Sequence, residues 1–135
     1  MKVGLVLACM VLIAPMAQAA KKCDKAMAIA AEQQASSLPS LSSLRAAYRH
    51  FSGCDDGAIA EGYSESVGRV IAKDPSAMAS LRALKKTDPL FIAFVIRHID
   101  DTVPADRLAV IANIAKQCEA GDRELCDRAY HAATD

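Results

Sequence analysis

The chain has 135 residues, of which 53% are hydrophobic, and its 16 basic side chains balance its 16 acidic ones. A nucleic-acid-binding domain would show a clear basic excess, so this balance argues against nucleic acid as a partner. The length is enough for one domain with a single hydrophobic core.

The first 19 residues have the pattern of a secretory signal peptide. A lysine is followed by a continuous apolar run over residues 3–15, and small residues stand at Ala17 and Ala19. This pattern predicts cleavage after Ala19, export to the periplasm, and a mature domain of residues 20–135. The apolar run is shorter than the roughly 20 residues that a membrane-spanning helix needs, so we expect no membrane anchor after cleavage.

Cys9 leaves a second interpretation of the leader open. The segment Val6-Leu7-Ala8-Cys9 resembles a lipoprotein acylation box. Acylation at Cys9 would leave a further apolar stretch, residues 10–15, directly after the anchor, and the proportions of a signal peptide favour ordinary cleavage. The mass of the mature N-terminus distinguishes the two interpretations.

Four cysteines remain in the mature part: Cys23, Cys54, Cys118 and Cys126. An even number of cysteines in an exported chain predicts two disulfides. Cys118 and Cys126 flank an expected helix boundary, and Cys23 and Cys54 precede two helices that begin at the same end of a bundle. Of the three pairings, we therefore expect Cys23–Cys54 and Cys118–Cys126.

Neither a metal nor a cofactor is expected. The three histidines are scattered along the chain and no C-x-x-C motif occurs, whereas zinc ligands usually cluster. Motifs for a serine-hydrolase nucleophile, a zinc peptidase, a P-loop or a dinucleotide fold are also missing from the sequence. We therefore expect no catalytic residue and no enzymatic activity.

The mature chain has the composition and capping signals of helices throughout. Ser40, Asp74 and Asp88 are expected to cap helices, the latter two each followed by a proline at the first helical position. Helices are predicted over residues 24–35, 41–51, 55–73, 75–86, 89–99, 104–120 and from 123 onward. The expected fold is an all-α, compact bundle of about six or seven short helices.

Two helices carry special packing signals. Residues 90–96 are apolar all round, which predicts a rod at the centre of the packing, shielded on every side. In the helix over residues 55–73, small residues recur every four positions in two ridges that include Gly62 and Gly68. Such ridges allow neighbouring helices to approach closely, and we prefer this to an open groove.

Asp55, Asp56, Glu61 and Glu65 form the most unusual local cluster of the sequence. They could present an acidic edge to a protein partner, and they are our candidate partner-binding residues. The alternative is that the two aspartates only cap a helix and favour its positive end.

His98 lies close in sequence to Asp100 and Asp101, so an acid–base pair is conceivable. However, His98 continues the apolar face of a buried helix. A hydrogen-bonded histidine at the edge of the core is therefore the preferred interpretation.

The run from Cys54 to Ser64, together with Asp88-Pro89 and residues 97–100, resembles a group of uncharacterised small exported helical proteins of proteobacteria. In architecture and size, the chain is also similar to the periplasmic immunity proteins that neutralise type VI secretion amidases. This second resemblance implies a non-enzymatic protein-binding module that blocks the active site of a toxin, and it assigns no individual residue. A structural or chaperone-like component of the cell envelope, or a small enzyme with an unrecognised site, are the alternatives.

Overall fold

The computed structural model describes residues 22–135, and all regular structure in this part of the chain is helical. The all-α fold expected from the sequence is therefore confirmed. The expected signal peptide and Cys9 lie outside the described residues. The elements are α1 (Lys25–Ala35), α2 (Leu41–Phe51), the 3-10 helix η1 (Ser52–Cys54), α3 (Gly57–Lys73), α4 (Ser76–Leu84), α5 (Pro89–Arg97), α6 (Ala105–Lys116), the 3-10 helix η2 (Ala120–Asp122) and α7 (Arg123–Thr134).

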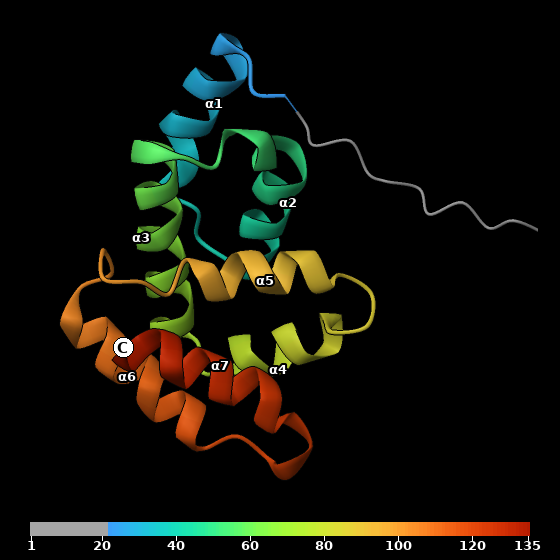
Figure 1. Ribbon diagram of the computed structural model, residues 1–135, viewed down its shortest axis with the longest axis vertical. Coiled ribbons are helices and arrows are strands. Elements are labelled where there is room, and N and C mark those ends of the chain that lie inside the picture. The colour runs from blue at the N-terminus through green and yellow to red at the C-terminus, as the bar shows by residue number, and fades with distance from the viewer. Residues whose placement is uncertain (1–21) are drawn as a thin grey trace, which may run out of the picture.

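The long helix α3 organises the bundle (Figure 1). It runs along the long axis of the molecule, with α1 and α2 beside its first half and α4 and α6 beside its second half. The helix α5 crosses between these two groups, and α6 and α7 form an antiparallel hairpin at the far end. Side chains from both groups therefore meet around α3 and α5.

Short polar side chains begin three of the helices. Asp24 accepts a hydrogen bond from the backbone nitrogen of Met27, and Ser40 forms a reciprocal capping box with Ser43. Asp56 occupies the same position before α3. These caps satisfy backbone N–H groups that have no partner within the helix, which explains why the first two boundaries were predictable.

One expected helix boundary is confirmed and another differs from the prediction. Asp88 stands at the N-cap of α5, and its carboxylate interacts both with the backbone of Phe91 in the first turn and with arginines of α2. The helix α6 ends at Lys116, so Gly121 does not terminate it but lies in η2. A turn that follows the helix therefore decides the local structure around Gly121.

The core contains aromatic side chains from three helices. Tyr63 of α3 and Phe94 of α5 pack edge to face with their ring centroids 5.2 Å apart, and Tyr48 of α2 lies 5.0 Å from Phe94 and 5.7 Å from Phe91. Tyr63, Phe91 and Phe94 are almost entirely buried. Such rings contribute much of the buried apolar area of a small domain.

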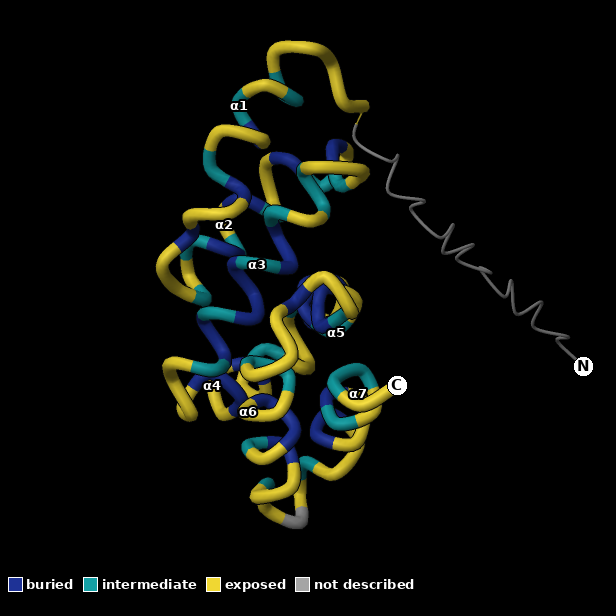
Figure 2. Tube along the Cα trace, turned by 90° about the vertical axis from the view of Figure 1, so that its left-hand side faces the viewer, coloured by how far each residue is buried: buried dark blue, intermediate teal, exposed yellow. Residues whose placement is uncertain are grey.

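The apolar helix α5 is not shielded on every side, contrary to the prediction. Phe91, Phe94 and Val95 face the core, but Leu90 is 59% exposed and Ala93 is also exposed. Figure 2 shows buried and exposed stretches alternating along the trace of this helix. A helix at the junction of two groups still has one edge that neither group covers, and sequence periodicity alone does not reveal that edge.

The two glycine-containing ridges of α3 pack closely, as expected. A Cβ atom on Gly62 would lie 2.8 Å from Cβ of Ala35 and 3.1 Å from the backbone nitrogen of Ser36, at the end of α1. A Cβ atom on Gly68 would lie 2.5 Å from a methyl group of Val103. The distances of 2.8 and 2.5 Å are too short for a real Cβ atom, so Gly62 and Gly68 allow the neighbouring segments to approach α3 closely.

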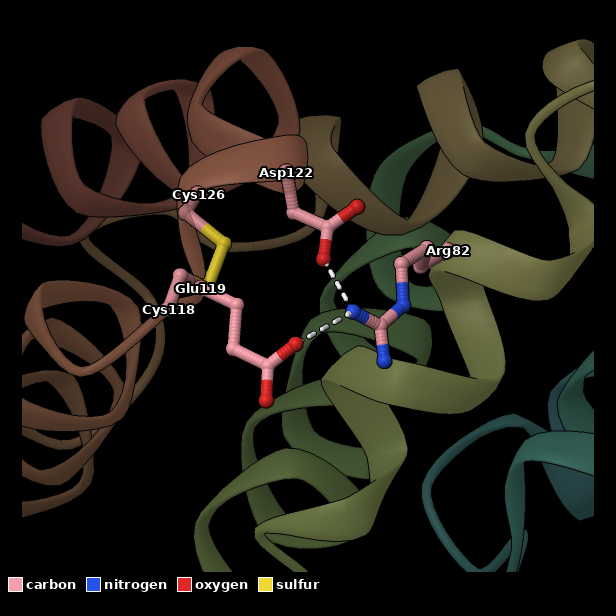
Figure 3. The surroundings of a disulfide bond; sticks show 5 residues. All are labelled: Arg82, Cys118, Glu119, Asp122 and Cys126. Carbon is pink, nitrogen blue, oxygen red and sulfur yellow. Dashed lines mark hydrogen bonds and ion pairs between the residues drawn. A yellow bond between two sulfur atoms is a disulfide. The ribbon is translucent and has the colours of Figure 1, made fainter.

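The two expected disulfides, Cys23–Cys54 and Cys118–Cys126, are present. The first joins the start of α1 to η1, and the second closes the hairpin of α6 and α7. Figure 3 shows that Arg82 of α4 lies beside the second disulfide, where it forms ion pairs with Asp122 and Glu119. Each bridge thus links two segments at one end of the bundle. Because a disulfide lowers the conformational entropy of the unfolded chain, each one adds about 2–4 kcal/mol to the free energy of unfolding.

Candidate functional site

A continuous network of buried polar side chains joins Asp55, His98, Ser64 and Asp100. Nε2 of His98 lies 3.1 and 3.2 Å from the two carboxylate oxygens of Asp55, and its Nδ1 lies 3.0 Å from Oγ of Ser64. The Ser64 hydroxyl donates to Asp100 over 2.7 Å. The side chains of Asp55 and His98 are 5% and 3% exposed, and Ser64 is 1% exposed.

Four different segments supply this network. Asp55 lies in the turn between η1 and α3, Ser64 lies in the middle of α3, and His98 is the C-cap residue of α5. Asp100 belongs to the loop before α6, where Thr102 donates to it from its backbone nitrogen over 2.9 Å and from its hydroxyl over 2.5 Å. The network therefore connects the N-terminal group of helices to the loop that leads into α6.

The two carboxyl groups of the network are held in their ionised form. Burial alone would raise the pKa of Asp55, but the hydrogen bond and charge of His98, together with Arg97, outweigh burial and lower this pKa. Burial would also raise the pKa of Asp100, but the hydrogen bonds from Thr102 and Ser64 outweigh burial and lower this pKa below its usual value. Hydrogen bonds to a charged form favour that form, so these contacts compensate for removing the carboxylates from water.

Arg97 covers the outer side of the network. Its guanidinium forms an ion pair with Asp55 and lies 5.9 Å from the ring centroid of Phe94. The arginine side chain is 63% exposed, whereas its carboxylate partner is buried. Arg97 therefore belongs both to the buried network and to the outer surface.

The Ser64, His98 and Asp55 side chains are of the types that form hydrolase triads, but their setting is different. A catalytic serine must reach the substrate, and its hydroxyl must be free to pass its proton to the histidine. The Ser64 hydroxyl is sealed from solvent and is directed to Asp100, with the Ala60 carbonyl 3.2 Å away. In this arrangement the network acts as a polar cross-link between helices.

Tyr63 adds a second unusual group next to the network. It is fully buried, and its hydroxyl has no hydrogen-bond partner among the described residues. Burial, with the nearby charge of Asp55, raises the pKa of Tyr63 to about 12. A buried hydroxyl without a hydrogen-bond partner lowers stability. Tyr63 therefore stabilises the core through the packing of its ring and not through its hydroxyl.

The four acidic residues expected to form a binding edge differ in their contacts and exposure. Asp55 is directed inward to His98, and Glu65 forms ion pairs with Arg69 over 3.3 Å and with Arg107 over 2.7 Å. Asp56 is exposed and accepts from the backbone nitrogen of Gly57, and Glu61 is exposed. Tertiary contacts therefore compensate two of the four charges, those of Asp55 and Glu65, and a binding role for the cluster stays a prediction.

The placement of His98 at the edge of the core is confirmed, but its acidic partner was not found from the sequence. Asp100 reaches the imidazole only through Ser64, and Asp101 is exposed. The direct partner is Asp55, 43 positions away. No local pattern connects these two residues, and only the fold of η1 against α5 brings them together.

A second feature missed by the sequence analysis is an exposed surface that we call the α2–α5 face, formed by Tyr48, Arg49, Leu90, Ala93 and Arg97. The ring contacts of Tyr48 with α5 and the ion pair of Arg49 with Asp88 hold the two helices together here. Beside this face, Ser42, Arg45, Ala46, Arg49 and His50 line a shallow hollow of about 440 Å³.

Among residues 22–135, no group of three or more His, Cys, Asp or Glu residues is arranged to hold a metal ion. In the same part of the chain, none of the helices combines the length and hydropathy needed to cross a bilayer. No protein-family model, curated protein or solved structure matches the chain. The function must therefore be argued from the geometry.

Proposed function

We propose that the mature chain is a non-enzymatic protein-binding module of the periplasm, and that its specific role is that of an inhibitor or immunity protein. One observation carries this proposal: Leu90 is 59% exposed on an apolar helix that also carries the exposed Arg97, and Tyr48 and Arg49 of α2 contact the same helix and its N-cap residue Asp88. Tyrosine and arginine around an apolar centre are typical of protein interfaces.

The interior of the molecule supports the same proposal. Ser64 and His98, the side chains best suited to act as a nucleophile and a base, connect helices and are buried away from solvent. The exposed features of the α2–α5 face are instead those that a binding protein uses. The surface is also well supported, because Phe91 and Phe94 anchor α5 in the core.

The disulfides support the proposed compartment. Two disulfides are consistent with an oxidising environment outside the cytoplasm, because cytoplasmic proteins are kept reduced. They also make the scaffold rigid, which lowers the entropy lost on binding.

The proposal is tested by affinity capture from the periplasm of the host, with the full chain expressed from its own promoter and quantified by mass spectrometry. We expect one protein at near-stoichiometric amounts, and we expect deletion of the gene to sensitise cells to attack by kin. Many weakly enriched proteins and a general stress phenotype would instead indicate an envelope component and would overturn the proposal.

The enzyme alternative has one specific observation in its favour, the contact of Ser64 with His98. Ser64→Ala tests it directly. If the chain protects cells as well after this substitution as before, the serine has no catalytic role. Loss of protection without loss of folding would favour the enzyme.

A further inference from the structure

We propose that the α2–α5 face binds an acidic segment of the partner protein, with carboxylates opposite Arg49 and Arg97 and an apolar side chain against Leu90. This inference rests on the proposed function and adds to it the surface and the chemistry of the partner. It also differs from the sequence-based expectation, which placed binding on an acidic edge around α3.

The first argument is the depth at which the charges lie. Both arginines pair with a carboxylate of their own chain, yet the arginines are outermost. The side chains of Arg49 and Arg97 are 61% and 63% exposed, whereas those of Asp88 and Asp55 are 14% and 5% exposed. A partner therefore meets the cations first, with the compensating anions beneath them.

The guanidinium group of Arg97 retains capacity for a second carboxylate. Among the described residues, the guanidinium of Arg97 donates a hydrogen bond only through Nη2, and the acceptor is the carboxylate of Asp55. A guanidinium carries five N–H donors in a fork that matches a carboxylate, so Arg97 can bind a second carboxylate while it keeps the first.

The hollow beside the face has the same charge. Two arginines and a histidine, Arg45, Arg49 and His50, line it, and no acidic residue does. Arg49 belongs both to the hollow and to the face, so the two surfaces are continuous. An acidic side chain that enters the hollow is close to the guanidinium groups of Arg45 and Arg49, which also pair with Asp88.

The apolar part of the face is formed by Leu90 and Ala93, which are exposed at i and i+3 on α5, with Arg97 at i+7. Leu90 and Arg97 are seven residues apart on α5, which corresponds to about 10 Å along the helix. One or two turns of a partner helix, or a short extended segment, cover this distance. A partner segment with an apolar residue between acidic residues would match the pattern.

A second copy of this chain does not match the face equally well. The acidic cluster that it could offer is divided, because Asp55 is buried against His98 and Glu65 is paired with Arg69 and Arg107. We therefore assign the face to a different protein.

The test compares capture by the wild-type chain with capture by substituted chains. Leu90→Glu places a carboxylate in the centre of the face, and Arg49→Gln removes one outer cation while Arg45 still pairs with Asp88. The matched controls are Val110→Glu, at a 41% exposed apolar residue of α6, and Arg128→Gln, at an exposed arginine of α7. We expect Leu90→Glu to weaken binding of the captured protein by about tenfold or more. Arg49→Gln should reduce both the affinity and its dependence on salt, and the controls should change neither.

A photo-crosslinking amino acid at Ala93, with Ala109 of α6 as the control position, maps the contact. A crosslink from Ala93 to a segment rich in Asp and Glu supports the inference. Crosslinking to a second copy, to an anionic lipid or to a basic segment overturns it. A stoichiometric partner that is captured equally by Leu90→Glu overturns the inference but leaves the proposed function intact, whereas capture of no protein overturns both.

Discussion

The inner and outer sides of α5 use the same kinds of residue with opposite consequences. On the inner side, His98 packs against the rings of Tyr63 and Phe94 and pairs with the buried carboxylate of Asp55. On the outer side, Arg49 and Arg97 are 61% and 63% exposed, and their carboxylate partners Asp88 and Asp55 are only 14% and 5% exposed. The comparison shows that depth determines the role: a buried charged pair holds helices together, whereas an exposed cation above a buried anion is available to a partner.

The largest effect is expected from removing the anion at the centre of the inner network. Asp55→Ala leaves His98 and Arg97 without their carboxylate, and removing one partner of a buried pair costs about 3–5 kcal/mol. The free energy of unfolding, measured with urea, should fall by an amount in this range. Asp101→Ala, at the exposed aspartate nearby, is the control and should have little effect. Equal stability of the two variants would show that the inner network is not a structural cross-link.

A somewhat smaller effect is expected where the network's loop packs against α3. Gly68→Ala places a methyl group against Val103, in the loop that also carries Asp100, and overpacking of this kind costs about 1–3 kcal/mol. Gly62→Leu should be destabilising in the same way, through Ala35 and Ser36. Gly121→Ala, where nothing lies within 4 Å, is the control. Thermal unfolding of the three variants measures the difference, and identical midpoints would mean that the loop adjusts without cost.

Acid should weaken the inner network as its carboxyl groups take up protons. The pKa values of Asp55 and Asp100 are lowered in the folded protein, so their stabilisation is complete above the unfolded value of 3.8. It is lost as the pH falls further through the folded pKa values, where the native state must also take up protons. Urea unfolding at a series of pH values should show this loss below about pH 4. The slope should be shallower in Asp55→Asn and unchanged in Asp101→Asn.

Tyr63→Phe should stabilise the protein. This substitution removes a buried hydroxyl without a hydrogen-bond partner among the described residues and keeps the ring against Phe94. Leaving such a group unpaired costs about 1–3 kcal/mol, and we expect a gain of about 1 kcal/mol. The gain should be measurable by urea unfolding at neutral pH, and a loss of stability would show that the hydroxyl has a role that its contacts do not reveal.

The smallest effect on stability is expected on the outer side. Leu90→Glu changes a side chain that is 59% exposed, and surface substitutions of this kind usually alter stability by less than about 0.5 kcal/mol. Circular dichroism and urea unfolding should therefore match the wild type. If Leu90→Glu instead unfolded the chain, the outer edge of α5 would be part of the core and the comparison would fail.

Several local features could be predicted from the sequence because their cause lies within a few residues. Ser40 caps α2, Cys118 and Cys126 pair across eight positions, and the small residues of α3 allow close packing. The pairing of Cys23 with Cys54, 31 positions apart, was instead predicted from the end of the bundle at which their two helices begin. The acidic cluster could not be resolved in this way. Asp55 and Asp56 are adjacent in sequence, yet one is buried against a histidine 43 positions away and the other is exposed.

The sequence by itself determined the helical class, most helix starts and the two covalent links, because capping, helix propensity and cysteine number act locally. The tertiary structure alone decided which charges are compensated and which edge of α5 remains uncovered. Both depend on which segments lie next to each other after folding, since charge compensation and burial are properties of neighbours in space.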